Sequence, residues 1–197
     1  MHRIFAGMAV WAVALLLAEF ALGILTRRVQ PALVGWHLAF GVFVAIYVCV
    51  LHVMVMFHFI GSGKEMKEHA RILGDNAEIL RRLRRLKMQV MPAATFAPVL
   101  IMAGAILGGG AHTKALGDWA WIHWALALAG LLLNLYVFPI EYRCLKANLE
   151  LLHEVDERIR REISPALESP ITKESPATSA SVRMTQGERT AGESNPG

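Results

Sequence analysis

Two histidines, His37 and His123, lie at similar short distances inside one end of two different apolar segments of the chain. An ionisable side chain inside a membrane-length apolar segment is costly, and it therefore usually has a function. Imidazole nitrogens bind transition metals and the iron of haem, so two of them on separate helices can hold one cofactor from opposite sides. The first hypothesis from the sequence is a cofactor held between His37 and His123.

Four long apolar segments are the elements that would position these histidines. Apolar residues make up 55% of the 197 residues and charged residues only 18%, with a mean hydropathy of +0.42. Charge is confined to blocks between the apolar segments, whereas a helix of a soluble domain would carry charge along one face. Each segment is long enough to cross a hydrocarbon core of about 30 Å, which needs about 20 helical residues. The sequence predicts transmembrane helices at about residues 4–25, 32–60, 90–111 and 119–142.

Amphipathic segments continue three of these predicted spans. Apolar residues at helical spacing predict helices over about residues 64–88, interrupted by a turn at Gly74, and over about residues 143–163. We expect these segments to pack together as a small cytoplasmic bundle. The alternative is that each lies as a separate amphipathic helix on anionic lipid.

The chain after residue 163 has a different composition, rich in Pro, Ser, Thr, Glu and Gly. Such a segment buries too little apolar surface to offset the entropy of ordering, which predicts a disordered tail over residues 164–197. The predicted fold is therefore all-α. Residues 1–163 form an integral membrane four-helix bundle, up-and-down, with cytoplasmic helical extensions, and a disordered C-terminal tail follows.

Basic residues predict the orientation in the membrane. The connection between the second and third predicted spans carries eight Lys and Arg residues, and Arg143 and Lys146 follow the fourth span. The connection between the third and fourth spans carries only Lys114. Because Lys and Arg are retained on the cytoplasmic side, we expect a multi-pass protein of the cell's inner (cytoplasmic) membrane with both termini cytoplasmic. Arg27 and Arg28, in the first connection, then face outward against this rule.

The depths of the two histidines match in this topology. At 1.5 Å per residue, His37 lies about 7 Å and His123 about 6 Å below the outer boundary, on diagonal helices that run in the same direction. Such a pair can clamp a flat macrocycle, one axial imidazole from each side. The layout resembles that of membrane b-type cytochromes, which hold bis-histidine haem inside a four-helix bundle, and this implies haem b here. Nearby glycines would leave room for it, although Gly104-x-x-x-Gly108 is also an ordinary device for close helix packing.

Two other histidines extend the hypothesis. His52 follows His37 by 15 residues, which places it about 22 Å deeper and about 60° around the helix, as a second haem would require. The matching position on the fourth span, near Phe138, holds no histidine. His112, predicted in the outer connection, is an alternative partner for His37.

Glu19 is the charged residue of the first predicted span. It lies about 9 Å below the outer boundary, near the level of His37 and His123. A lone carboxylate in hydrocarbon protonates or finds a partner. It could exchange protons beside a haem or a quinol, or complete a metal site of two histidines and one carboxylate. The structural alternative is a hydrogen bond to a neighbouring helix.

Three functional hypotheses follow from the sequence. The first is an integral membrane redox subunit with one b-type haem near the outer face, exchanging electrons with quinone or with another membrane redox subunit. The second is a cofactor-free four-helix anchor or scaffold, and the third is a membrane protein that binds a transition metal through His and Glu. The sequence contains no Walker motif, no nucleophile constellation and no C-x-x-C pair, so we expect an electron-transfer or anchor subunit more than an autonomous enzyme. The expected partners are the lipid bilayer, these redox partners and further copies of the chain as a homo-oligomer, with no nucleic acid.

Overall fold

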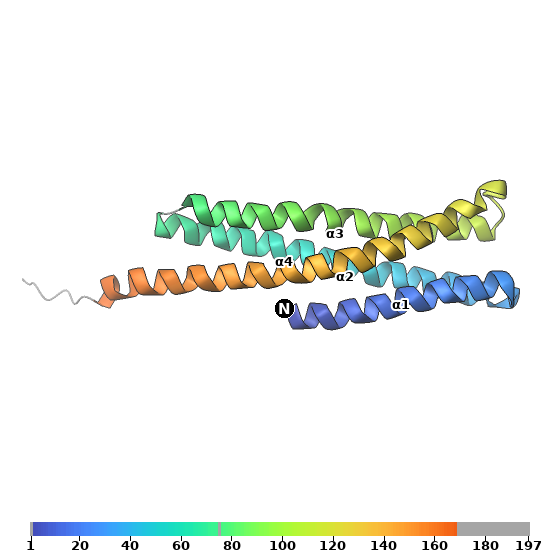
Figure 1. Ribbon diagram of the computed structural model, residues 1–197, viewed down its shortest axis with the longest axis horizontal. Coiled ribbons are helices and arrows are strands. Elements are labelled where there is room, and N and C mark those ends of the chain that lie inside the picture. The colour runs from blue at the N-terminus through green and yellow to red at the C-terminus, as the bar shows by residue number, and fades with distance from the viewer. Residues whose placement is uncertain (1, 75, 169–197) are drawn as a thin grey trace, which may run out of the picture. The chain divides into compact units, whose positions relative to one another are not determined.

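The structure is a computed structural model that describes residues 2–74 and 76–168, and its regular elements there are all helical. The all-helical fold class predicted from the sequence is confirmed. The elements, in chain order, are α1 (His2–Arg28), the short 3-10 helix η1 (Pro31–Leu33), α2 (Val34–Leu73), α3 (Asn76–His112), the 3-10 helix η2 (Gly117–Ala120) and α4 (Trp121–Glu168) (Figure 1).

The chain divides into two compact units, residues 1–159 and residues 160–197, and every contact described below lies within the first. Helix α4 continues to Glu168, so the first residues of the predicted tail, 164–168, are helical. The rest of that predicted tail lies outside the described residues.

Helices α2, α3 and α4 are much longer than a bilayer requires, with 40, 37 and 48 residues. The predicted amphipathic extensions are continuous with the apolar spans. Helix α2 ends at Gly74, which adopts the left-handed conformation with φ 70° and donates its N–H to the carbonyl of Arg71. This is the usual glycine cap of a helix, and it makes the tight turn into α3.

The loops after α1 and α3 lie at one end of this unit, called here the Trp119 end, and the turn at Gly74 lies at the other (Figure 1). Helices α1 and α3 both pack against α2. Helices α2 and α4 run in the same direction, because His37 lies beside His123 and, farther along both helices, His52 lies beside Glu141. Side chains of the second and fourth predicted spans therefore meet at more than one level.

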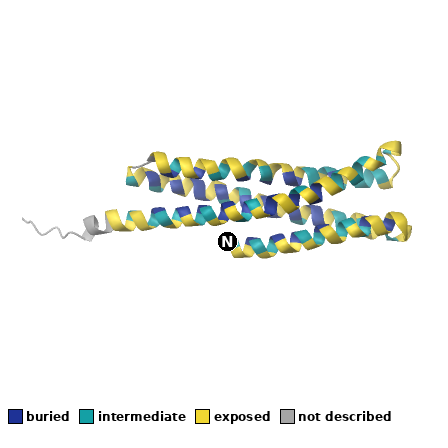
Figure 2. Cartoon of the chain, in the orientation of Figure 1, coloured by how far each residue is buried: buried dark blue, intermediate teal, exposed yellow. Residues whose placement is uncertain are grey.

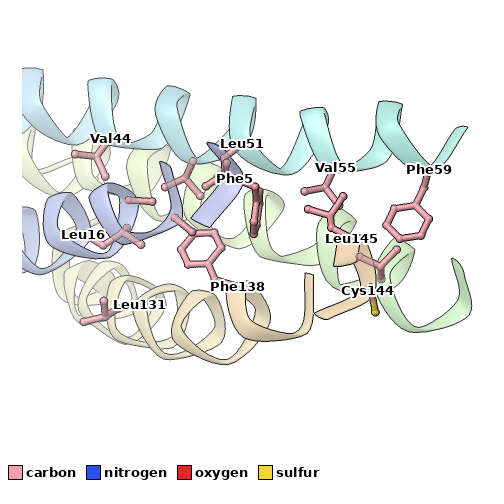
Figure 3. Packing of buried hydrophobic residues seen from close by; sticks show 14 residues of the cluster. Phe5, Leu16, Val44, Leu51, Val55, Phe59, Leu131, Phe138, Cys144 and Leu145 are labelled. Atoms are coloured by element: carbon pink, nitrogen blue, oxygen red, sulfur yellow. The ribbon is translucent and has the colours of Figure 1, made fainter. Parts of the chain in front are cut away.

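The main core follows one face of α2. Its members on that helix are Val44, Val48, Leu51, Val55 and Phe59, each at most 1% exposed. Their spacing of three or four residues keeps them on a single stripe. Figure 3 shows this stripe facing side chains from two other helices, namely Phe5 and Leu16 of α1 and Leu131, Phe138, Cys144 and Leu145 of α4.

A second apolar cluster joins the helical extensions beyond this core. Its buried residues come from α2, α3 and α4: Met66, Ala70, Ile79, Leu83, Leu151 and Val155. The extensions therefore pack on one another through this cluster.

The outward faces of the four helices are strongly apolar. Each helix contains a window long and apolar enough to cross a membrane, with mean hydropathy from 1.6 to 2.6, yet only 22–33% of the residues in these windows are buried. Trp11, Trp36 and Phe96 are 67%, 73% and 67% exposed. Figure 2 shows buried residues on the faces where helices meet and exposed residues elsewhere. Apolar exposure on this scale suggests a multi-pass membrane protein, whose outer faces meet lipid instead of water.

Candidate cofactor site

The imidazoles of His37 on α2 and His123 on α4 face each other near the Trp119 end. Their ring centroids are 6.3 Å apart and their planes are inclined by 61°. Both side chains are half-buried, not exposed on a flat surface. The two histidines for which the helical rise predicted a matched depth thus lie beside each other in the structure.

A backbone carbonyl orients the ring of His123. Its Nδ1 lies 2.9 Å from the carbonyl oxygen of Gly104 on α3. A carbonyl oxygen only accepts hydrogen bonds, so Nδ1 of His123 carries the proton and donates it. The Nε2 atom of the neutral ring is then left with its lone pair, as in histidines whose second nitrogen is held by an outer partner while the first binds a metal.

A carboxylate from α1 approaches the ring of His37. Nδ1 of His37 lies 2.7 Å from Oε1 of Glu19, and the two side chains are only 23% and 16% exposed. The contact is close enough for an ion pair but lacks the geometry of a hydrogen bond. Nδ1 of His37 therefore has no hydrogen-bond partner among the described residues, and Oε2 of Glu19 is likewise buried without one. Unpaired buried polar atoms are uncommon in protein interiors.

Glycines on neighbouring helices form the walls against which these three side chains lie. A Cβ at Gly23 would come within 3.0 Å of Cε1 of His37, and one at Gly108 within 2.9 Å of Cε1 of His123. Larger side chains at either glycine would push the imidazole away. The glycines beside the histidines therefore serve the site itself as well as helix packing.

A third glycine, Gly41 on α2, does the same for the carboxylate. A Cβ there would come within 2.6 Å of Oε1 of Glu19. Gly104 differs from these three glycines. The nearest atoms to a Cβ at Gly104 would belong to α4, at 3.9 Å or more, so this glycine lies at the packing contact between α3 and α4 and does not contact the side chains of the site.

Three cavities adjoin the histidine pair, with volumes of about 90, 50 and 280 Å³, and His37 and His123 line all three. The first lies between the helices and is otherwise mostly apolar. The largest lies toward the helix ends and is also lined by Arg27, His112 and Trp124. The site is therefore a hollow region that reaches from the core to the Trp119 end.

The remaining predicted ligands have different surroundings. His112 is the last residue of α3 and is exposed, although it lines the same cavities as the histidine pair. Among the described residues, no group of three or more His, Cys, Asp or Glu side chains is arranged to hold a metal ion. The set of Glu19, His37 and His123 therefore falls short of a preformed three-ligand metal site.

His52 is fully buried, and both of its ring nitrogens have partners on α4. Nδ1 lies 2.7 Å from Oε1 of Glu141, and Nε2 lies 2.9 Å from Oδ1 of Asn134. Asn134 donates its own N–H to the carbonyl of Gly130 at 2.8 Å, so its oxygen accepts from His52. Phe138 stacks on the His52 ring at 5.4 Å, at the level predicted from the helical rise. No nitrogen of His52 is left to bind iron in this arrangement.

Sequence reasoning did not identify Glu141 as the partner of His52. The signal was present as a spacing: Asn134, Glu141 and Asn148 follow one another at intervals of seven residues, which keeps them on one face of α4. All three are fully buried, and Asn148 donates to Ser62 of α2 at 2.8 Å. A polar stripe on an otherwise apolar helix indicates contacts with another helix.

Comparisons with known proteins find no counterpart for this chain: no protein-family model matches it, and no curated protein and no solved structure matches it significantly. Its function is therefore inferred from the geometry of the site alone.

Proposed function

We propose that this protein is a multi-pass subunit of the inner (cytoplasmic) membrane that binds one b-type haem between His37 and His123 and transfers electrons to or from quinone or another membrane redox subunit. In this proposal the four helices form an up-and-down bundle with both termini and the helical extensions in the cytoplasm. The Trp119 end is then the outer face. The basic residues of the α2–α3 connection support this orientation.

The observation that carries the proposal is the pair of facing imidazoles. A metal–imidazole bond is about 2 Å long and the ring centre lies roughly 1 Å behind the bonding nitrogen, so two axial imidazoles on one iron have ring centres roughly 6 Å apart. The centroids of His37 and His123 are 6.3 Å apart. This separation of the ring centres matches the value expected for two axial imidazoles on one iron.

The outer partners of both rings support the same role. The Gly104 carbonyl accepts a hydrogen bond from the Nδ1–H of His123, and the Glu19 carboxylate lies beside Nδ1 of His37. The hydrogen bond of His123 favours its Nε2 as the iron ligand and raises the basicity of that nitrogen, and the nearby carboxylate would favour Nε2 of His37 in the same way once Nδ1 donates to it. Haem would supply one-electron chemistry, while these residues would hold the iron, fix the ring orientations and set the local charge.

The surrounding space fits a macrocycle in part. Ligand pockets for molecules of this size have volumes of roughly 300–1,000 Å³. The largest cavity beside the pair measures about 280 Å³, and smaller cavities of about 90 and 50 Å³ share the same histidines. Because each of these cavities is smaller than this range, entry of a porphyrin would require α2 and α4 to separate at the Trp119 end.

An absorption spectrum of the protein purified from membranes tests this proposal directly. We expect a Soret band and sharp α and β bands in the reduced-minus-oxidised spectrum, with about one haem per chain. A colourless protein that also fails to bind added haem would contradict the proposal. Parallel metal analysis tests the metal-binding alternative, which the lack of a preformed three-ligand group among the described residues does not favour.

One observation favours the second candidate, a cofactor-free scaffold. The extensions of α2, α3 and α4 form their own apolar cluster beyond the main core, and this part of the molecule offers a folded surface to partners. A colourless protein that co-purifies with partners through residues 64–88 and 143–159 would support that function.

A further inference from the structure

Arg27, near the end of α1, is a cation placed at the mouth of the proposed haem site. Its guanidinium carbon lies 5.3 Å from the ring centroid of Trp124, in cation–π contact. Trp124 follows the proposed ligand His123 in sequence. The ring centroids of Trp124 and His123 are 6.1 Å apart, in an edge-to-face arrangement. Trp124 therefore lies in contact with both Arg27 and the proposed ligand His123.

The cavity of about 280 Å³ connects Arg27 with both proposed ligands. Its lining includes three imidazoles, two indole rings, one hydroxyl group and this one guanidinium, and it includes no Asp or Glu. Among the described residues, Arg27 forms no ion pair with a carboxylate. A cavity lined by aromatic rings, with a cation at its rim that no carboxylate pairs among the described residues, suits an aromatic ligand that carries an acidic edge.

We propose that Arg27 binds the propionate carboxylates of the haem, so that the macrocycle lies in the site with its acidic edge toward the Trp119 end. This inference rests on the proposed haem site between His37 and His123. The guanidinium presents a fork of N–H donors that matches a carboxylate. The recorded contact with Trp124 is a cation–π contact and not a hydrogen bond to an acceptor oxygen.

The proposal also accounts for a feature of the sequence. Arg27 and Arg28 lie in a connection that the distribution of basic residues places outside, where such residues are disfavoured. Arg27 lines the cavity, whereas Arg28 lines none of the three cavities at the histidine pair. Arg28 is therefore a matched control: it is the same residue type, one position away, also exposed, and it lines none of these cavities.

The test compares two forms of iron porphyrin. The apoprotein in detergent is titrated with ferric protoporphyrin IX and with its dimethyl ester, which lacks the carboxylates, and the bis-histidine absorption spectrum reports binding. We expect the wild-type protein to bind the free acid roughly three- to tenfold more tightly than the ester, as for a partly exposed charge-assisted pair. Arg27→Gln should remove this preference by weakening binding of the acid alone, and Arg28→Gln should keep it.

The possible results separate this inference from the proposed function. If the wild type and Arg27→Gln show the same ratio of acid to ester affinity, the assignment of Arg27 is wrong while the haem site stands. If both arginine variants lower the ratio equally, Arg27 acts as a general interfacial charge and the assignment is again wrong. If neither porphyrin gives a bis-histidine spectrum with the wild type, both proposals are overturned. Thermal unfolding of each variant without porphyrin shows whether a loss of binding reflects a loss of the fold.

Discussion

At the scale of single residues, the site depends on two imidazoles whose Nδ1 atoms have different neighbours. His123 has its Nδ1 held by Gly104, and His37 has its Nδ1 beside Glu19. His52, by comparison, has both nitrogens engaged by Asn134 and Glu141. The same residue type on the same helix is thus an available ligand at one level and a satisfied core residue at another.

We predict that His37→Ala and His123→Ala each abolish the bis-histidine haem spectrum, because an iron with one axial imidazole loses both the spectrum and much of its affinity. His153→Ala is the control, since His153 is exposed on α4 and pairs with Glu157, far along the chain from the site. Pyridine haemochrome assays on purified variants measure the haem content. If His123→Ala keeps its full haem content and His112→Ala loses it, the histidine at the end of α3 is the true ligand.

A second prediction concerns the charge of Glu19. Glu19→Gln should retain haem and raise its midpoint potential, because an ionised carboxylate stabilises the more positive oxidised iron and strengthens donation from His37. For a charge roughly 7 Å from the iron in a medium of effective dielectric constant about 20, the expected shift is on the order of 100 mV. Potentiometric titration followed by absorption measures it over a range of pH.

If the substitution instead leaves the potential unchanged at every pH and only lowers the melting temperature, Glu19 is a packing residue that meets His37 for structural reasons. That result would favour the scaffold function over the redox function.

At the scale of helices, the sequence predicted the depth of a residue along its helix better than the side chain with which that residue pairs. His37 and His123 could be matched from the sequence because the rise of a helix is fixed, so depth follows from residue number. The pairing of His52 with Glu141 could not, because it depends on how α2 and α4 are rotated toward each other. Glu141 also lies near the predicted end of its span, where a carboxylate normally faces water. The long extension of α4 instead keeps it fully buried.

We predict that Glu141→Leu strongly destabilises the fold, because it leaves Nδ1 of the buried His52 without a partner. Removing one member of a buried pair typically costs about 3–5 kcal/mol. The double variant His52→Leu/Glu141→Leu should recover much of this loss, since well-packed apolar residues replace such pairs at little cost. Unfolding in mixed detergent measures the free energies. A double variant as unstable as the sum of the two single variants would show that the pair is not the source of the effect.

Neighbouring glycines on α3 provide another test of the site. A Cβ at Gly108 would lie 2.9 Å from Cε1 of His123, whereas a Cβ at Gly109 would meet nothing within 4 Å. We predict that Gly108→Ala displaces the imidazole and lowers haem affinity by tenfold or more, on the order of 1.4 kcal/mol. Gly109→Ala should leave haem binding unchanged and slightly stabilise the helix. Equal affinities of the two variants for haem would remove Gly108 from the site.

At the scale of the whole molecule, two regions of the same helices meet different surroundings. Toward the Trp119 end the helices expose large apolar side chains, whereas the extensions over residues 64–88 and 143–159 carry charged residues around a separate apolar cluster. This change in surface character predicts where the membrane ends, and the basic residues predict on which side the charged part lies. The placement of the proposed haem site near the outer face depends on that orientation.

The last prediction is therefore the topology. In a variant without Cys49 and Cys144, single cysteines are introduced at Glu65 and at Thr113, which are exposed on the two opposite ends of α2 and α3. A membrane-impermeant maleimide applied to intact cells should label the cysteine at position 113 and not the one at position 65, and permeabilised cells should give both. Because positive charge is held on the cytoplasmic side, the reverse pattern would require about ten basic residues to cross the membrane. That result would move the histidine pair to the inner half of the bilayer, and its redox partner would then have to act from the cytoplasm.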